Sequence, residues 1–537
     1  MTLMKNHGRT AEQALDALVE HFHLNIEQSA DLLAEEQRVL ASPGLDDDVH
    51  DQTSVPYVTI DNVDSRDLDQ AIHVENSESG WRVRYALADA SYYVRLGSPI
   101  WDRALAMGSS FYLPDRSIPM LPRSLSEGLI SLNPGVDRRA LVFDMHVDRS
   151  GTLTNATVSR CRVHSRAKLA YTGVQAWVDG DGPLTGDDAL DVGVARSMHA
   201  LRAVGECRML LQEDRGVLPL HRSEADVRVV DGQWVATRRA RNDVERWNEQ
   251  ISLLTNMAGA QLLMEFGWSS DAVQAVYRVH LPPLPQRLRR LEETLDALAQ
   301  REGEQWRWRR GVEDLADYLT RLPAAPNRRA ISVHRQVQYT FRASTFKARS
   351  GPHHALGVDG YSRMSSPMRE AVGIFSHKEL LEGLGLTRPG SQAIDEAARD
   401  AVIASANAAK KRQRALDKAV DLLVIEAALC RELQAPEAER PSHLGTLVGL
   451  SGGQLYVALD ELAVDVKVYR THVESDYGCD YTLDGDVALI PKEQGAGPTF
   501  TLGDSVSVRV RKWDEQRRRY ALQIEHSANI ENDKKSP

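Results

Sequence analysis

The chain has 537 residues, of which 42% are hydrophobic and 26% charged, the composition of a folded globular protein with room for two to four domains. It has no apolar run of the roughly 18–20 residues that a membrane-spanning helix needs, and its first residues lack the apolar core of a secretory signal. The net charge of −11 excludes a uniformly basic surface, but Lys and Arg cluster at 287–310, 410–414 and 508–519. These clusters are compatible with a basic groove for nucleic acid, and equally with solvated faces.

Two helices are predicted at the N-terminus. Apolar residues between positions 14 and 22 recur at helical spacing, and Asn25 followed by Gln28 is typical of the cap that opens a second helix through residue 40. The broken pattern at 42–48 predicts a linker. We therefore expect residues 1–48 to form a small helical module, either of the helix-turn-helix kind or a plain helical extension.

From about residue 54, strands and helices alternate without a regular repeat, which predicts a large mixed α/β (α+β) domain over 49–432. The strand candidates are "VPYVTI", "WRVRYALAD", "RRALVFDMHV" and "ATVSRCRVH". The helix candidates are 99–107, 192–214, 244–266, 285–301 and 392–432.

A Pro- and Glu-rich stretch at 433–443 predicts a boundary, and short strands at close spacing follow it. Five or so strands within 440–527, including "VDVKVYRTHV", predict a small β-barrel of the OB type. Its last two strands carry Arg and Lys at alternate positions, so one side would face the core and the other an RNA backbone. We expect residues 528–537 to be disordered.

Four aspartates crowd the end of the first strand of this domain, in "TIDNVDSRDLD". They are Asp61, Asp64, Asp67 and Asp69. Carboxylates at this density repel one another unless a cation neutralises them, and Mg²⁺ prefers such oxygen ligands. A calcium-binding loop is disfavoured, because the stretch has no glycine and the wrong spacing. A solvated acidic turn remains possible from local features, although apolar segments flank the cluster on both sides.

The same segment resembles the signature of the ribonuclease II family, whose catalytic module is the RNB domain: a strand ending in Asp, then, after five residues, Asp-x-Asp-Asp. Further segments are similar to the family's in the same order, and together they cover roughly residues 50–430. They are "FYLPDRSIPMLPRSLSEGLISLNPG", "SRAKLAYTGVQAWVDG", "NEQISLLTNMAGAQLL", "AVYRVHLPP" and "GYSRMSSPMREAVGIF". The C-terminal strands are similar to the family's usual final domain, an OB fold of the ribosomal-protein S-one type.

The resemblance implies an enzyme of RNA degradation. Its members are processive, metal-dependent exonucleases that shorten single-stranded RNA from the 3′ end and release nucleoside 5′-monophosphates, so we expect magnesium, with manganese as a substitute. By match to the family, Asp61, Asp67 and Asp69 are the expected metal ligands, and Asp69 is the one expected to be most critical for the rate. Arg369 matches the arginine taken to contact the scissile phosphate.

Three further residues match positions on the family's RNA path: Tyr112, Tyr171 and Glu249. Each also has an ordinary structural interpretation. Tyr112 could be a core tyrosine, and Glu249 could form a polar pair with Asn256, which lies seven residues later on the same helical face. In the same way, Arg369 could be a surface ion pair.

Three departures from the family pattern matter. Gln70 stands where the family has a fourth aspartate, and an amide oxygen is a weak, uncharged metal ligand, so we expect an unusual metal optimum. Glu370 stands where a basic residue is usual, and we expect it to pair with Arg369. Only about fifty residues precede the aspartates, too few for the family's two cold-shock domains, so the helical module of 1–48 would replace them.

Gln70 also motivates an alternative function, an RNA-binding protein with a decayed RNB catalytic centre. A DNA exonuclease is a third possibility, since no residue reports contact with a 2′-hydroxyl. The four singly placed cysteines predict neither a zinc site nor disulfides, which favours a reducing cytoplasm. The absence of heptads favours a monomer.

Overall fold

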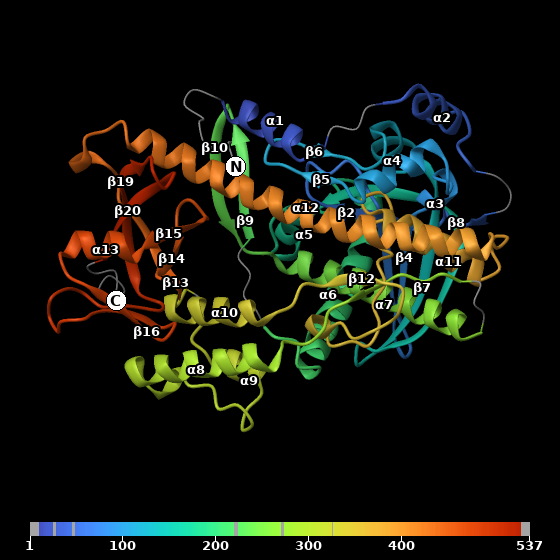
Figure 1. The fold of residues 1–537 in the computed structure, drawn as a ribbon. Coiled ribbons are helices and arrows are strands. Elements are labelled where there is room, and N and C mark those ends of the chain that lie inside the picture. The colour runs from blue at the N-terminus through green and yellow to red at the C-terminus, as the bar shows by residue number, and fades with distance from the viewer. Residues whose placement is uncertain are drawn as a thin grey trace.

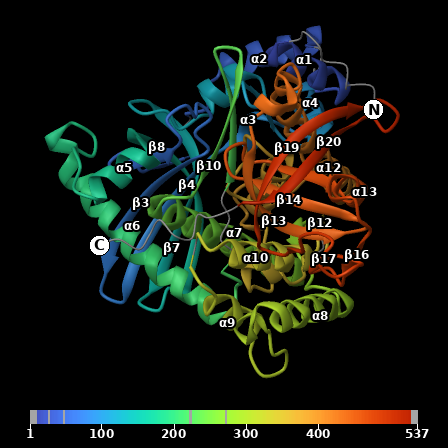
Figure 2. The ribbon, with the colours of Figure 1, turned by 90° about the vertical axis from the view of Figure 1, so that its left-hand side faces the viewer.

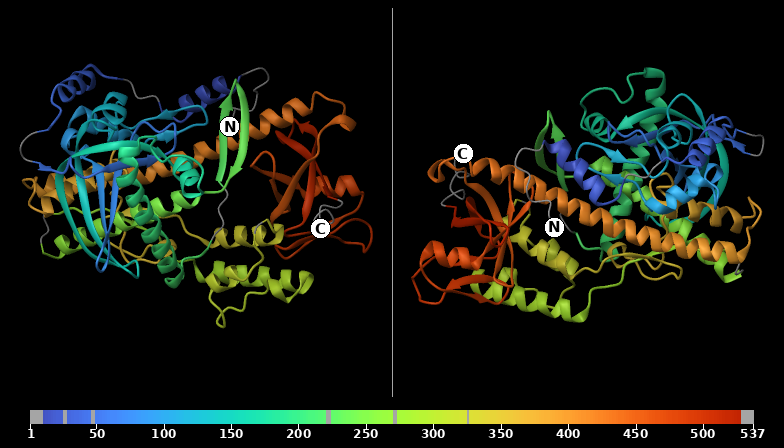
Figure 3. Two further views of the ribbon diagram at one scale, coloured as in Figure 1. Left: turned by 180° about the vertical axis from the view of Figure 1, so that it is seen from behind. Right: turned by 45° about the horizontal axis from the view of Figure 1, so that its top comes forward.

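The computed structural model describes residues 10–24, 28–45, 49–219, 224–269, 273–324 and 326–527 (Figure 1). Helix α12 (Gln392–Glu432) runs across the molecule and joins two β-rich regions, as seen from two sides in Figures 1 and 3. Within the described residues, no helix is long and apolar enough to cross a membrane. Two sequence predictions, the cap at Asn25 and the disordered tail at 528–537, fall outside these residues.

The larger β-rich region is built on one sheet in the strand order β1-β8-β2-β3-β4-β7. The last strand, β7, also pairs with β8, so β8, β2, β3, β4 and β7 form a closed ring of pairings. Strand β8 makes this possible by its length: its first part lies antiparallel to β7, and its last part lies parallel to β2. The strands are β1 (His50–Asp51), β2 (Tyr57–Asp61), β3 (Gln70–Ser77), β4 (Gly80–Ala88), β7 (Asp137–Asp148) and β8 (Leu153–Ala170).

Both faces of this sheet are covered, which explains why the predicted strand "VPYVTI" is apolar throughout. Successive side chains of β2 alternate between two cores: Tyr57 packs in one, and Val58 and Ile60 pack in the other. Helices α6 (Asp188–Asp214) and α7 (Asp243–Ser269) contribute to the second core, and Figure 2 shows α6 crossing the strands on that side.

The first core is completed by α12 and by helices from three parts of the chain. Their bounds are α3 (Ala90–Tyr93), α4 (Pro99–Met107) and α11 (Ala371–Gly383). Helix α5 (Tyr171–Val178) follows β8 directly, and a π-helical turn covers Ser124–Leu129. Four short pieces of strand form two small pairs: β5 (Phe111–Tyr112) with β6 (Ser117–Ile118), and β11 (Tyr277–Val279) with β12 (Thr345–Lys347).

The two predicted N-terminal helices exist, as α1 (Ala11–His21) and α2 (Ala30–Leu40). Their buried leucines belong to the first core of the large sheet, because α1 packs on α12 and α2 packs on α4. The start of the second helix lies within the described residues, although Asn25 does not. Helix α2 begins at Ala30, and the Ser29 hydroxyl caps it by accepting from the Leu32 amide at 3.2 Å.

Between the two β-rich regions stands a hairpin, β9 (Glu224–Val230) and β10 (Gln233–Arg239), visible in Figures 1 and 3. Below the hairpin in Figure 1 lie α8 (Pro285–Glu302), α9 (Leu315–Thr320) and α10 (Arg328–Thr340). Two 3-10 turns cover Glu304–Trp306 and His354–Leu356. The apolar residues of α8 and α10 pack in one core with the C-terminal strands, although the sequence pattern groups them with the catalytic module.

The C-terminal region contains a five-stranded sheet in the order β15-β14-β13-β19-β20 and a three-stranded sheet, β16-β17-β18. One predicted strand, "VDVKVYRTHV", is wrong in its second half. Strand β15 ends at Tyr469 because its partner β14 begins opposite, at Gln454, and helix α13 starts at Arg470. The elements are a 3-10 turn (Glu437–Glu439), β13 (His443–Ser451), β14 (Gln454–Leu459), β15 (Asp465–Tyr469), α13 (Arg470–Tyr477), β16 (Tyr481–Asp484), β17 (Ala488–Pro491), β18 (Phe500–Thr501), β19 (Ser505–Asp514) and β20 (Arg519–His526).

Candidate active site

Two of the predicted site residues meet at one edge of the large sheet. Strands β2 and β8 run parallel there, with Asp61 paired to Ala170, so Asp61 ends one strand and Tyr171 follows the other. The Tyr171 hydroxyl accepts a hydrogen bond from the Asn248 amide of α7 at 2.9 Å. Burial, reinforced by the charge of Asp61, raises the pKa of Tyr171, so its hydroxyl stays protonated and can donate toward this edge.

Asp69 lies at the end of the loop between β2 and β3 and is held rigidly. The adjacent Leu68 amide donates to the Ser131 hydroxyl at 2.9 Å, and the Asp69 carbonyl accepts from the Ala88 amide at 2.8 Å. Lys168 also anchors this loop by donating to the Val63 carbonyl at 2.9 Å. Asp69 is only 1% exposed, so its carboxylate has a fixed position within the protein.

The carboxylate of Asp69 is engaged by the segment that carries Arg369. The Met368 amide donates to Asp69 Oδ1 at 2.9 Å, and Arg369 Nε donates to Asp69 Oδ2. Burial raises the pKa of Asp69 to about 6, Arg369 opposes this shift, and the nearby charge of Asp67 reinforces it. The structure therefore brings together the predicted critical carboxylate and the predicted phosphate-binding arginine.

Asn256 of α7 fixes the segment that presents Arg369. Its amide nitrogen donates to the Tyr361 hydroxyl at 2.9 Å and to the Ser365 hydroxyl at 3.0 Å. Its carbonyl oxygen accepts from the Met364 and Ser365 amides at 2.7 and 3.1 Å. Asn256 is fully buried, so these bonds have no competition from solvent, and the suggested pair with Glu249 does not form.

The expectation that Glu370 pairs with Arg369 is wrong. Glu370 accepts from Arg363 Nε at 3.2 Å, while Arg369 turns to Asp69. Glu370 forms an isolated bridge with Ser109 and then leads into α11, and its carboxylate lies within 3.2 Å of Arg363 Nε. Glu370, which stands where the family usually has a basic residue, is thus paired with Arg363, seven positions earlier in the sequence.

The other acidic-motif residues, Asp61, Asp67 and Gln70, differ in their burial and hydrogen bonds. Asp61 is half-buried and accepts from the Asn62 amide at 2.8 Å and the Ser65 hydroxyl at 2.9 Å. Asp67 is half-buried, and burial together with the charge of Asp61 raises its pKa. The Gln70 side-chain oxygen accepts from the Tyr85 hydroxyl and so has one lone pair already engaged.

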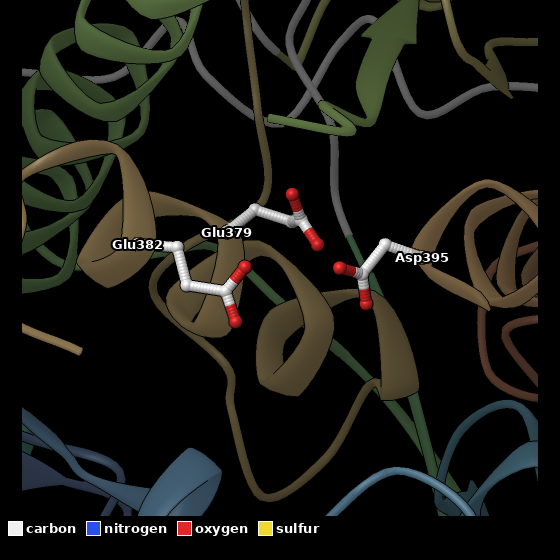
Figure 4. Close-up of side chains that lie close together, drawn as sticks. All are labelled: Glu379, Glu382 and Asp395. Carbon is white, nitrogen blue, oxygen red and sulfur yellow. The ribbon is translucent and has the colours of Figure 1, made fainter. Parts of the chain in front are cut away.

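Another acidic cluster meets the geometric requirement for a metal site more closely. Within the described residues, Glu379, Glu382 and Asp395 are the three carboxylates whose oxygens all lie within 4.8 Å of one another (Figure 4). The Lys378 ammonium contacts all three, at 2.8, 2.9 and 2.7 Å. The Lys378 ammonium therefore stands where a metal ion would be needed. The cluster is a structural ion-pair network that links α11 to α12.

The residues at Asp69 fit a divalent cation on the chemistry of their donors. The charge of Asp61 raises the pKa of Asp67, and the charge of Asp67 raises that of Asp69, so each neighbouring pair of carboxylates is within electrostatic reach. Arg369 supplies one positive charge against their three. A hard cation with oxygen ligands compensates such an excess of negative charge. The fourth predicted ligand, Gln70, is the weakest, because its oxygen is shared with Tyr85.

The other predicted RNA contacts lie at the surface around this site. Tyr112 is 48% exposed, which rules out a fully buried core tyrosine, and the charges of Arg369, Asp67 and Asp69 all act on its pKa. Glu249 is exposed on α7 and pairs with Arg241 at 3.1 Å. Asp64 is exposed in the loop, as expected for a position outside the family motif.

Sequence reasoning missed the residues that support the site from a distance. Asn248 orients Tyr171, Tyr85 engages Gln70, and Arg363 neutralises Glu370. Asn248 and Arg363 lie inside segments that resemble the family, but nothing in their local pattern assigns them a partner. Contacts of this kind depend on the tertiary fold.

Comparison with known proteins assigns the family. The model of the RNB domain matches residues 49–384, and the chain therefore belongs to the RNB domain family. It is 27% identical to ribonuclease R of Vibrio cholerae over 473 residues and 27% identical to ribonuclease R of Escherichia coli over 483 residues. Each alignment covers 86% of this chain and 55% of the relative, so the chain spans about half the length of these curated proteins.

Solved structures agree with the fold over nearly the whole chain. Ribonuclease R of Mycoplasma genitalium, in complex with ribose-methylated single-stranded RNA, superposes with a TM-score of 0.81 at 20% identity, over 95% of this chain and 77% of that one. The yeast pseudonuclease Ssd1 superposes less closely, with a TM-score of 0.60 at 12% identity, over 86% of this chain and 53% of that one. At these identities the likeness establishes the fold.

Proposed function

We propose that this protein is a magnesium-dependent, processive exoribonuclease that hydrolyses single-stranded RNA from the 3′ end to nucleoside 5′-monophosphates, with manganese as a substitute cofactor. The observation that carries the proposal is the junction of Asp69 with Arg369, beside Asp61 and Asp67, in a chain of the RNB family. The names of its relatives, ribonuclease R, support ribonuclease activity, and the neighbour with bound RNA supports an RNA substrate.

The chemistry follows from the donors at the site. When a divalent cation is bound, it supplies a water of lowered pKa and neutralises developing charge on the phosphate. Asp61, Asp67 and Asp69 would hold it, with the Gln70 oxygen as a weaker ligand. Arg369 would donate to the non-bridging oxygens of the scissile phosphate, a role that suits a forked, permanently charged donor.

The RNA path is also a proposal. Tyr171 would contact the terminal nucleotide through its ring and its protonated hydroxyl, while the half-exposed Tyr112 would stack on a base. Glu249 lies one residue from Asn248, which orients Tyr171, and would accept from the terminal ribose. We divide the chain into a helical segment (1–48), an RNB module (49–432) and a C-terminal OB-type RNA-binding region (440–527), with residues 528–537 as a tail.

The cellular setting follows from the same chemistry. All four cysteines are free, which suits a reducing cytoplasm. A monomer suffices for the proposed reaction, since every side chain invoked comes from one chain. We propose that the protein acts in RNA degradation as a cytoplasmic monomer.

A shortening assay tests the proposal. RNA labelled at its 5′ end, incubated with the protein and magnesium, should be shortened from the 3′ end to a short labelled product with few intermediates. The unlabelled product that is released should be mononucleotide. A 3′-phosphorylated RNA and a reaction containing EDTA serve as controls. RNA that stays intact but shifts on a native gel would instead support the alternative, an RNA-binding protein with a decayed catalytic centre. The yeast pseudonuclease Ssd1, which has a similar fold, is an example of a pseudonuclease on this fold.

A further inference from the structure

A cavity adjoins the candidate active site and shares Arg369 with it. Its volume is about 240 Å³, and it lies between the segment that carries Arg369, the strand β5 and helix α12. Three cationic side chains line it, those of Arg363, Arg369 and Lys410, against one carboxylate, that of Glu370. The rings of Tyr112 and Phe346 also line it. The proposed reaction does not use Arg363, Lys410 or Phe346.

Lys410 is the unusual member of this lining. Its ammonium nitrogen is buried and has no hydrogen-bond partner among the described residues; it stands 4.5 Å from the centre of the Phe346 ring. An ammonium group carries three donors, and burying it without an acceptor is costly. Lys410 therefore has hydrogen-bonding capacity that the described part of the chain leaves unused.

The charged groups around Lys410 are also mostly positive. Arg278, Arg363 and Arg414 act on Lys410 as like charges, and Glu370 is the opposing carboxylate. Glu370 is hydrogen-bonded to Arg363, and Arg278 donates to the Ser344 hydroxyl. Burial and these cations lower the pKa of Lys410 to about 7, which an anion beside the ammonium group would reverse.

The remaining lining groups suit a phosphate. Ser109, Ser110 and Ser366 border the cavity along with Gln413, which holds the backbone of Tyr112 through two bonds of 3.3 Å. Hydroxyl groups beside two or three cations are the donors that recognise phosphate oxygens. The aromatic rings of Tyr112 and Phe346 provide apolar surface against which a base or ribose can pack.

We propose that this cavity is a binding site for a phosphate monoester, with Lys410 as its principal ligand. The identity of the ligand as a nucleoside 5′-monophosphate rests on the proposed function, because that reaction releases this class of product next to Arg369. Bound there, the product would lie beside the catalytic aspartates without occupying them. The site would make the enzyme sensitive to its own product and to inorganic phosphate.

Calorimetric titration of the full-length protein in EDTA tests the site without cleavage or metal. Adenosine 5′-monophosphate and inorganic phosphate are the two probes. The variant Lys410→Met should weaken binding about tenfold or more, the loss expected for one charge-assisted donor, and Lys410→Arg should retain it. Lys411→Met is the matched control, because Lys411 is the exposed neighbour on the same helix and should bind as the wild type does. Thermal unfolding of each variant confirms that it is folded.

The outcomes distinguish failure of the proposed binding site from failure of the proposed exoribonuclease function. Equal affinity of Lys410→Met and Lys411→Met, or no binding to the wild type, overturns the site even if the protein is an active nuclease. Lys410-dependent binding in a protein that never shortens RNA supports the site and refutes the proposed function. Binding of both probes assigns recognition to the phosphate alone, and binding of the nucleotide alone shows that the rings contribute.

Discussion

Asp69 and Arg369 are 300 positions apart in the chain, and their side chains form a hydrogen-bonded ion pair at the edge of the large sheet. The carboxylate is buried, while the guanidinium is 31% exposed. We therefore expect that a metal ion, when bound, would replace Arg369 as the partner of the Asp69 carboxylate. Arg369 would then be free to contact a phosphate. The proposed activity depends on this relationship.

Restoring the family's fourth aspartate should change the metal requirement. In Gln70→Asp, a charged carboxylate replaces an amide oxygen that now accepts from Tyr85. We expect half-maximal cleavage at a lower concentration of magnesium than the wild type needs. Titrations of both metals measure this, and superimposable curves for the variant and the wild type would contradict it.

Asn256 should act as a positioning residue for Arg369. Asn256→Ala removes four hydrogen bonds to the segment 361–365, so we expect the free energy of unfolding to fall by about 1–3 kcal/mol. Displacement of Arg369 should also lower the cleavage rate about tenfold to a hundredfold.

Urea unfolding and single-turnover cleavage measure the two effects. Gln261→Ala, at an exposed position on the same helix, is the control and should change neither. A normal cleavage rate in folded Asn256→Ala would show that this residue supports stability alone.

The pair Arg363–Glu370 should behave as a coupled unit. Glu370→Gln leaves a half-buried guanidinium among other cations, so we expect a loss of about 1–3 kcal/mol in stability. Adding Arg363→Met to this variant should recover part of the loss, because the unpaired charge is removed. A double-mutant cycle in urea measures the coupling; strictly additive losses would mean that the ion pair does not matter.

The junction of α12 with the C-terminal sheet should depend on pH. His443 and Glu432 are both buried and contact at 2.8 Å, and the hydrogen bond to Glu432 raises the pKa of His443. The stability that the pair contributes is therefore fully present below the unfolded-state pKa of about 6.5 and is lost as the pH rises through the folded-state value.

Thermal unfolding of His443→Gln and of the wild type at a series of pH values tests this. The difference in Tm should be largest on the acidic side, near about pH 6, and should shrink above the folded-state pKa. A difference that grows toward alkaline pH would contradict the assignment.

Local patterns in the sequence predicted much of the fold. The helices at 99–107 and 392–432 are found with those bounds, because each has a clear apolar stripe and a distinct end. Strand β2 and the aspartate that ends it are also as predicted. The predictions that failed involve tertiary contacts: the strand at 464–473 stops where its partner strand begins, and Glu370 pairs with an arginine that no local pattern singles out.

The site was predictable only in its motif residues. Asp61, Asp67, Asp69 and Arg369 carry a family pattern, whereas Asn256 is recognisable as important only once its four bonds to a distant segment are seen. Lys410 has no signal beyond a basic run, since neither its burial nor the lack of a hydrogen-bond partner in the described part of the chain can be read from sequence.

The most direct test of the account is Asp69→Asn. The amide can still accept from the Met368 amide, so the fold should survive, but the charge that we propose binds metal is gone. Measured with 5′-labelled RNA and magnesium, this variant should shift RNA on a native gel as the wild type does and leave it uncut. Wild-type shortening by folded Asp69→Asn would show that the buried carboxylate is not the catalytic metal ligand.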